Sequence, residues 1–166
     1  MESNRQSYRL KGYDYSRKGF YFITICTHKR ACFLGYIKQK QMILSEIGQI
    51  ASQYFQNIPN HYPHVEVLAQ VVMPNHLHGL LYFTEGANFD ERVSDFQQVV
   101  SKSLSVIINQ YKGAVTKYAN QNQISFQWQK KFHDAIIWDI NDCSSVIHYI
   151  ENNIENWAED DFYEEG

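Results

Sequence analysis

The sequence predicts an α+β domain in which helices pack on one face of an antiparallel sheet. Two observations support this class. Short β-branched and aromatic runs alternate along the chain with segments whose apolar residues recur every three or four positions. The chain has 166 residues with 44% apolar and 15% aromatic content, which suits one compact core. We therefore expect residues 1–166 to form a single domain, with an acidic end at about 158–166.

Four strands are predicted from runs of β-branched and aromatic residues. Residues 20–27 and 32–37 are two such runs, separated by a short basic turn. Residues 65–73 and 76–83 are two more, and the Met73-Pro74-Asn75 breaker between them predicts an antiparallel hairpin. These runs supply the strands of the sheet.

Two helices are predicted from apolar residues at three- and four-residue steps. The first covers about 46–57, with Ser45 as its N-cap. The second runs from Val93 to Tyr111, with its cap at residues 94–95 and Gly113 past its end. Both helices have one apolar face, which can pack on the sheet.

The C-terminal part adds short strands and a last helix. Residues 113–125 are polar and predict a loop, whereas residues 126–128 and 135–138 predict short extended pieces. Asn141 and Asp142 can cap a final helix. The apolar stripe of this helix is Val146, Ile150, Ile154 and Trp157.

Composition excludes several classes of protein. No apolar run approaches the roughly 18 residues that a membrane span needs, and residues 1–9 are polar rather than signal-like. The three cysteines, Cys26, Cys32 and Cys143, are odd in number and lack CxxC spacing, which argues against a disulfide framework. We therefore expect a soluble, cytoplasmic protein with no membrane partner.

The charge distribution is more informative than the net charge of −3, which by itself argues against a polyanionic partner. Residues 1–40 hold nine basic and two acidic side chains, and residues 101–133 hold five lysines and no acid. Residues 134–166 hold ten acids and no base. The two basic segments are either solvated faces or parts of a phosphate-binding surface. The candidate DNA-binding residues in them are Arg17, Lys18, Lys29, Arg30, Lys102, Lys130 and Lys131.

The sequence His76-Leu77-His78 is the first feature that indicates chemistry. In a strand, side chains two residues apart point to the same face, so the two imidazoles converge while Leu77 points to the other face. Such a pair can bind one divalent metal ion and leave positions open for a substrate and a third protein ligand. The alternative is two partly exposed strand histidines without a metal.

Tyr149 and Asn153 are the second feature. Four residues apart in the predicted last helix, they share one face of it. Asn is a weak helix former, and its amide oxygen can bind a metal ion. If this helix crosses the face that carries the histidines, a phenol that can act as a nucleophile lies beside the metal.

Three segments resemble one known family. Residues 71–81, with the sequence Val-Val-Met-Pro-Asn-His-Leu-His-Gly-Leu-Leu, resemble the hallmark segment of the HUH single-tyrosine transposases. Residues 13–27 resemble the N-terminal strand of their REP-associated and insertion-sequence-like branch. Residues 128–153 contain segments that resemble the C-terminal block of that branch. The resemblance covers most of residues 8–157 in the expected order.

The resemblance implies a ferredoxin-like (RRM-like) fold and a transposase that nicks and joins single-stranded DNA beside a hairpin. It implies that His76, His78 and Asn153 bind Mg²⁺ or Mn²⁺, and that Tyr149 is the catalytic nucleophile. Attack by Tyr149 would leave a 5′-phosphotyrosine link and a free 3′-hydroxyl. It leaves open whether the protein is a monomer or a homodimer.

Other interpretations remain. Relatives often carry His and Arg where this chain has Ala135 and Trp138, which affects DNA binding rather than the metal ligands. A non-catalytic RRM-like module that binds single-stranded nucleic acid, or a domesticated inactive transposase, is the main alternative. A histidine-triad protein would need a third alternating His, but position 80 is Leu. A structural zinc site would need more clustered Cys or His.

Overall fold

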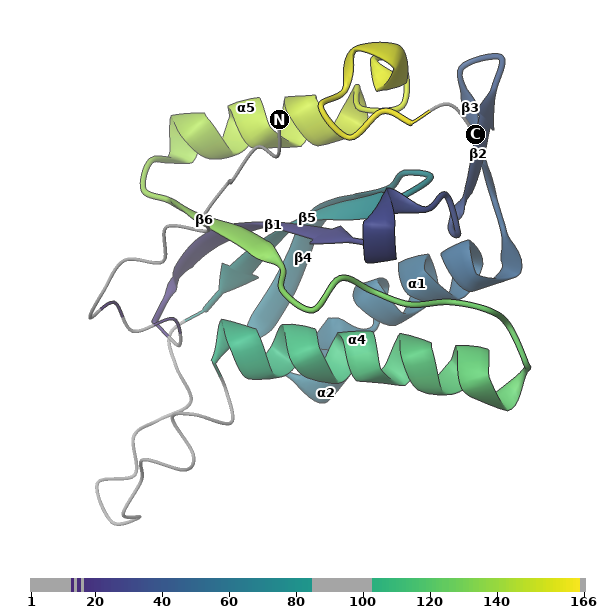
Figure 1. Cartoon of the computed structure of the whole chain (residues 1–166). Helices are drawn as coiled ribbons and strands as arrows, with labels where there is room; N and C mark the ends of the chain where they lie inside the picture. The colour runs from purple at the N-terminus through teal and green to yellow at the C-terminus, as the bar shows by residue number, and fades with distance from the viewer. Residues whose placement is uncertain (1–12, 14, 16, 85–102, 165–166) are drawn as a thin grey trace.

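The computed structural model describes residues 13, 15, 17–84 and 103–164. Its main feature is a four-stranded antiparallel sheet in the order β4-β5-β1-β6, with helices packed against it (Figure 1). The sheet consists of β1 (Gly19–Cys26), β4 (Val65–Val72), β5 (His76–Phe83) and β6 (His133–Ile137). The helices are α1 (Glu46–Gln56), the short α2 (Ile58–His61), α4 (Leu104–Gln121) and α5 (Ile140–Glu151).

The order of strands and helices confirms the ferredoxin-like α+β class. Strand β1, helix α1, strands β4 and β5, helix α4 and strand β6 follow one another as in the β-α-β-β-α-β motif. A separate two-stranded hairpin, β2 (Gly35–Lys38) and β3 (Gln41–Leu44), lies between β1 and α1 in the chain. Helix α5 follows the last strand of the motif.

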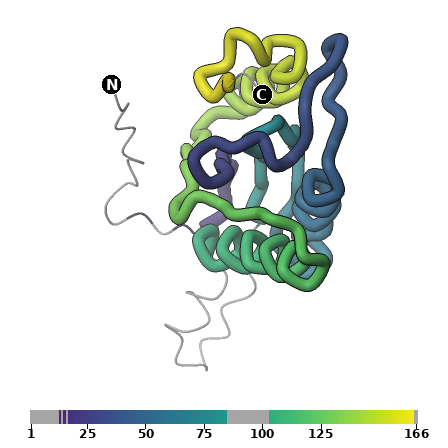
Figure 2. Tube along the Cα trace, turned by 45° about the vertical axis from the view of Figure 1, so that its right-hand side comes forward, coloured from purple at the N-terminus to yellow at the C-terminus, as the bar shows by residue number. Residues whose placement is uncertain are grey.

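The helices occupy both faces of the sheet, so the prediction that they all pack on one face is wrong for α5. Helices α1 and α4 cover one face and α5 covers the other, and Figure 2 shows α5 and α4 on opposite sides of the strands. Each face has its own apolar cluster. Leu77 and Leu81 of β5 belong to the cluster on the α1 side, whereas Leu80 packs with Cys143 and Ile150 of α5. The last helix therefore lies on the face of the sheet that carries the histidines, as the sequence hypothesis requires.

Gly79 allows α1 to approach the sheet. A Cβ atom on Gly79 would lie 2.3 Å from the ring of Phe55, which is fully buried in α1. Real atoms do not approach so closely, so only glycine lets the tip of this ring come so near to β5. The glycine thus fixes the packing of α1 against the back of the strand that carries the histidines.

Four predicted elements agree closely with the structure. Strand β1 corresponds to the run 20–27, and β4 and β5 form the predicted hairpin. Helix α1 begins after Ser45, whose side chain accepts a hydrogen bond from the Gly48 N–H group at 3.1 Å. Each of these elements depends on local patterns, namely alternation, a breaker and an N-cap.

The predicted second helix is wrong at its end, because α4 continues through Gly113 to Gln121. Buried Val115 and Ala119 extend its apolar face, and nothing lies within 4 Å of a Cβ atom placed on Gly113. Tertiary burial therefore outweighs the roughly 1 kcal/mol that a glycine costs inside a helix. Ser103 caps the observed helix, and the predicted start at 93–95 lies outside the described residues.

The predicted last helix is too long. Helix α5 is capped by Asp139, not by Asn141 or Asp142, and it ends at Glu151. Asn153 lies in the turns that follow, where its N–H group donates to the Ile150 carbonyl at 3.3 Å. A short 3-10 helix, η2 (Trp157–Glu159), comes next. The apolar residues beyond the helix end therefore belong to a segment that folds back, not to a continuing stripe.

The second predicted strand also differs. Residues 28–30 form a 3-10 turn, η1 (His28–Arg30). Among the described strands, β2 pairs only with β3, a strand that the sequence pattern does not predict. Gln39 and Lys40 connect these two strands with positive φ angles of 50° and 59°. Glycine and asparagine are the usual residues for such a turn, so the sequence carries no hairpin signal there.

Two exclusions can be compared with the structure. All three cysteines are free, as predicted. Within the described residues, no helix has both the length and the apolar character required to cross a lipid bilayer.

Candidate functional site

His76 and His78 lie side by side at the beginning of β5. They pair with Cys26 and Thr24 at the end of β1, and their exposed fractions are 0% and 2%. The centroids of the two rings are 4.6 Å apart. The strand therefore places both imidazoles on the α5 side of the sheet, while Leu77 enters the opposite core.

Asn75 determines which nitrogen of His76 carries the proton. The Asn75 amide nitrogen donates to the carbonyl oxygens of Arg30 at 3.2 Å and Phe162 at 2.7 Å. Its oxygen Oδ1 must therefore accept the 2.8 Å hydrogen bond that joins it to His76 Nδ1. The lone pair of His76 is thus on Nε2, in the orientation that a metal ligand needs.

His78 is held by a hydrogen bond between its Nδ1 atom and Thr24 Oγ1, 2.8 Å apart. Burial lowers the pKa of His78 from 6.5 to about 4. Burial, followed by the neighbouring His78, also lowers the pKa of His76 well below its usual range. Both imidazoles are therefore neutral at pH 7, which is the form that binds metal ions.

Tyr149, in α5, and Asn153, in the turn after α5, lie beside this histidine pair. The ring of Tyr149 is 46% exposed, and its centroid lies 5.4 Å from that of His78 and 6.2 Å from that of Phe22. Asn153 is 3% exposed, and its side chain lies close enough to affect the pKa values of His76 and Asp160. Although Asn153 follows the end of α5, the structure brings all four sequence-predicted residues to one place.

Sequence reasoning missed Asp160, which belongs to the acidic end. Its Oδ2 atom lies 3.9 Å from His76 Nε2, and one ligand atom each of His76, His78 and Asp160 lies within 4.8 Å of the others. Burial raises the pKa of the Asp160 carboxyl group, and a hydrogen bond from the Asn153 side chain acts in the opposite direction. A run of acids predicts solvated charge, so no local signal distinguishes this one.

The donor atoms fit a divalent metal ion. His76 Nε2, His78 Nε2 and Asn153 Oδ1 are all buried and have no hydrogen-bond partner in the described part of the protein. A buried polar atom without a partner costs about 1–3 kcal/mol, so native proteins rarely leave several together. A cation bound between these atoms would satisfy all of them at once.

The predicted basic residues fall into two groups. Lys29 and Arg30 follow the end of β1 near His76, and the backbone of His28 bonds to Gln127, so residues 127–131 run alongside them. Lys130 and Lys131 are exposed there, just before β6. Arg17 and Lys18 precede the opposite end of β1. Lys102 lies outside the described residues.

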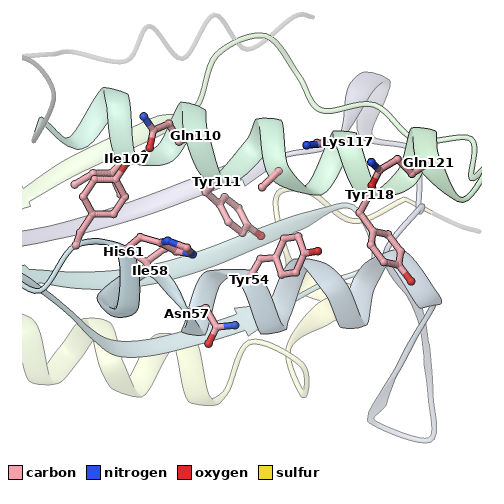
Figure 3. A pocket seen from close by; sticks show the side chains of 12 residues that line it. Tyr54, Asn57, Ile58, His61, Ile107, Gln110, Tyr111, Lys117, Tyr118 and Gln121 are labelled. Atoms are coloured by element: carbon pink, nitrogen blue, oxygen red, sulfur yellow. Dashed lines mark hydrogen bonds between the residues drawn. The ribbon is translucent and has the colours of Figure 1, made fainter.

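A separate cavity lies on the other face of the sheet. It has a volume of about 730 Å³ and lies between α1, α2 and α4 (Figure 3). Tyr54, Tyr111, Tyr118, His61 and Lys117 are among its lining residues. The sheet separates this cavity from His76 and His78, so it does not contribute to the candidate site.

Comparison with known proteins gives consistent relatives. An "Uncharacterized protein" of Haemophilus influenzae is 35% identical over 168 residues, which cover 96% of this chain and 93% of that protein. A "Putative REP-associated tyrosine transposase" of the same organism is 27% identical over 141 residues, covering 84% of this chain and 72% of that protein. No family model matches the chain.

A solved structure shares the fold. It is described as a REP-associated tyrosine transposase bound to a REP hairpin, and it matches with a TM-score of 0.53 and 20% identity over 87% of this chain and 71% of that one. The chain is thus similar in sequence to a protein described as a REP-associated tyrosine transposase and shares the fold of a solved one.

Proposed function

We propose that this protein is a metal-dependent enzyme of the HUH type that nicks and joins single-stranded DNA beside a hairpin. One observation carries the proposal. The buried atoms His76 Nε2, His78 Nε2 and Asn153 Oδ1, which have no hydrogen-bond partner among the described residues, lie next to the exposed phenol of Tyr149. A pure binding module has no use for such a combination of metal donors and nucleophile.

The proposed substrate is supported by a relative and by charge. The solved relative is bound to a REP hairpin. In this protein, Lys29, Arg30, Lys130 and Lys131 lie at the end of the sheet that carries the histidines. Cations at that place can hold the phosphates of a strand whose scissile bond reaches Tyr149.

In the proposed reaction, the Tyr149 phenolic oxygen attacks the scissile phosphorus and loses its proton. The bond from phosphorus to the 3′ oxygen breaks and that oxygen takes up a proton, so the products are a 5′-phosphotyrosine link and a free 3′-hydroxyl. Attack by another 3′-hydroxyl on this link reverses the step and joins strands. His76, His78 and Asn153 would hold Mg²⁺ or Mn²⁺, which would stabilise the negative charge that develops on the phosphate. Imidazole ligands favour Mn²⁺ over Mg²⁺.

We also propose that the protein acts in the reducing cytoplasm and that each chain carries its own complete site. Tyr149 lies within 5.4 Å of the His78 ring, centroid to centroid, inside one chain. A partner chain is therefore not needed to bring the nucleophile to the metal ligands.

The test is formation of a covalent adduct. With Mn²⁺ and a single-stranded oligonucleotide that contains a REP-type hairpin, the protein should form an adduct that survives denaturing electrophoresis. Tyr149→Phe should form none, because it lacks the attacking oxygen. Tyr36→Phe is the matched control, since Tyr36 is 57% exposed but lies on the separate β2–β3 hairpin.

Two outcomes would contradict this proposal. If the wild type forms no adduct with a broad pool of hairpin oligonucleotides, the chemistry is wrong. If Tyr149→Phe still forms the adduct, the nucleophile is wrong.

A further inference from the structure

We propose that Asp160 is a further ligand of the metal ion held by His76, His78 and Asn153. The C-terminal segment, defined here as residues 157–163, would then complete the metal centre. This inference rests on the proposed function, because it concerns the same metal site. It gives a binding role to an acidic stretch that the sequence pattern indicates only as solvated charge.

The distance between the donor atoms supports direct binding. Asp160 Oδ2 lies 3.9 Å from His76 Nε2, and the Asp160 side chain is 3% exposed. Two ligands that bind one ion, each about 2.1 Å from it, are at most about 4.2 Å apart. A separation of 3.9 Å thus accommodates an ion between the two atoms.

A direct hydrogen bond explains this arrangement less well. The separation exceeds that of a hydrogen bond, which is about 2.7–3.2 Å between nitrogen and oxygen. His76 Nε2 also has no hydrogen-bond partner in the part of the chain that the structure describes. The two groups therefore face each other across a gap of the right width for a metal ion.

The other carboxylate oxygen is already engaged. Asp160 Oδ1 accepts a 2.8 Å hydrogen bond from the Phe162 N–H group. This bond fixes the carboxylate, so that Oδ2 is the oxygen directed at His76. A ligand that is orientated in advance loses little conformational entropy when the metal binds.

The C-terminal segment is anchored beside the histidines by several contacts. Asn75 Nδ2 donates to the Phe162 carbonyl at 2.7 Å, and the Arg30 guanidinium lies 5.1 Å from the centroid of the Phe162 ring. That ring is itself 4.6 Å from the ring of His76, centroid to centroid. Asn75 thus orientates both His76 and the segment that supplies Asp160, which links the two halves of the donor set.

The resulting donor set consists of two imidazole nitrogens, one amide oxygen and one carboxylate oxygen. A carboxylate suits Mn²⁺ and Mg²⁺ better than another imidazole would, and it offsets part of the charge of the ion. These ions take about six ligands, so about two positions remain for a substrate phosphate or water.

Binding of Mn²⁺ without DNA tests this role apart from catalysis. We expect Asp160→Asn to weaken Mn²⁺ binding by about 10- to 100-fold, measured by titration calorimetry and by the EPR signal of free Mn²⁺. Glu159→Gln is the matched control, because it removes the same charge from the neighbouring exposed residue, and it should bind as the wild type does.

A spectroscopic variant distinguishes direct binding from a general charge effect. With Co²⁺ as the probe, Asp160→Cys should show a thiolate-to-cobalt charge-transfer band that wild type and Asp160→Asn lack. The native cysteines, Cys26 among them, are present in all three proteins, so a band from a native thiolate would appear in all of them. Absence of the band in a folded Asp160→Cys protein that binds Co²⁺ would overturn direct ligation.

The outcomes separate the two proposals. If His76→Ala abolishes Mn²⁺ binding but Asp160→Asn binds as tightly as the wild type, the role of Asp160 is wrong and the proposed function stands. If the wild type itself binds no Mn²⁺ and forms no DNA adduct, the proposed function fails, and the role of Asp160 fails with it.

Discussion

His78 links the metal site to the pH response of the metal-free protein. Its pKa is lowered by burial from 6.5 to about 4. Between these values the unfolded chain binds a proton at this position, whereas the folded protein holds the imidazole neutral. Because the unfolded state binds more protons in this window, stability falls as the pH falls from about 6.5 towards 4.

This shift predicts a measurable loss of stability. At about 1.4 kcal/mol for each unit, His78 alone should lower the free energy of unfolding by about 3 kcal/mol between pH 6.5 and pH 4. Urea unfolding of the metal-free protein at several pH values measures the total change. The His78→Asn variant should lack this contribution and show a flatter profile, so parallel profiles for the two proteins would refute the argument.

At the scale of the element, strand β5 contributes side chains to both faces of the sheet. Its odd-numbered residues pack under α1 and α4, while its even-numbered residues face α5 and include both histidines. Gly79 lies between the histidines and the rest of the strand, against Phe55 of α1. A change at this glycine would therefore alter the position of the strand that carries the metal ligands.

Two glycine-to-alanine variants should change stability in opposite directions. Gly79→Ala forces a Cβ atom to within 2.3 Å of the Phe55 ring, and such overpacking should cost about 1–3 kcal/mol. Gly113→Ala places its Cβ atom in open space on α4, so it should add about 0.5–1 kcal/mol. Denaturant unfolding of both variants checks the prediction, which a stabilising Gly79→Ala would contradict.

At the scale of the whole molecule, the site combines parts that lie far apart in the sequence. The start of β5 supplies the histidines, α5 and the turn after it supply Tyr149 and Asn153, and the C-terminal segment adds Asp160. The basic residues near this end belong to η1 and to the residues before β6. The proposed metal ligands and the proposed phosphate-binding cations are thus separate groups, which predicts that catalysis and DNA binding can be separated.

His76→Ala provides this separation. Loss of a metal ligand should lower DNA cleavage by at least about a hundredfold, since the metal stabilises the transition state by several kcal/mol. Affinity for the hairpin oligonucleotide should stay within about threefold, because the lysines and arginines proposed to bind phosphates are unchanged. Cleavage and electrophoretic mobility-shift assays on the same protein measure both. An equal loss of cleavage and binding in a folded variant would instead favour the binding-only alternative.

Local patterns were sufficient for much of this architecture. The alternation of His76, Leu77 and His78 puts both imidazoles on one face of any strand, and Ser45 caps α1 through its immediate neighbours. The run 65–83 contains its own breaker, so the β4–β5 hairpin follows from adjacent residues. These features depend on backbone geometry over a few residues, and a sequence pattern reports them directly.

Long-range packing was responsible for the rest. Helix α4 passes through Gly113 because Val115 and Ala119 are buried, and α5 stops at Glu151 before the chain turns back. Asp160 lies beside His76 because Asn75 and Arg30 hold the C-terminal segment over the strand. Such contacts join residues that no periodicity relates. The residues that can perform the chemistry are therefore evident in the sequence, whereas the carboxylate that faces them is revealed only when distant segments pack together.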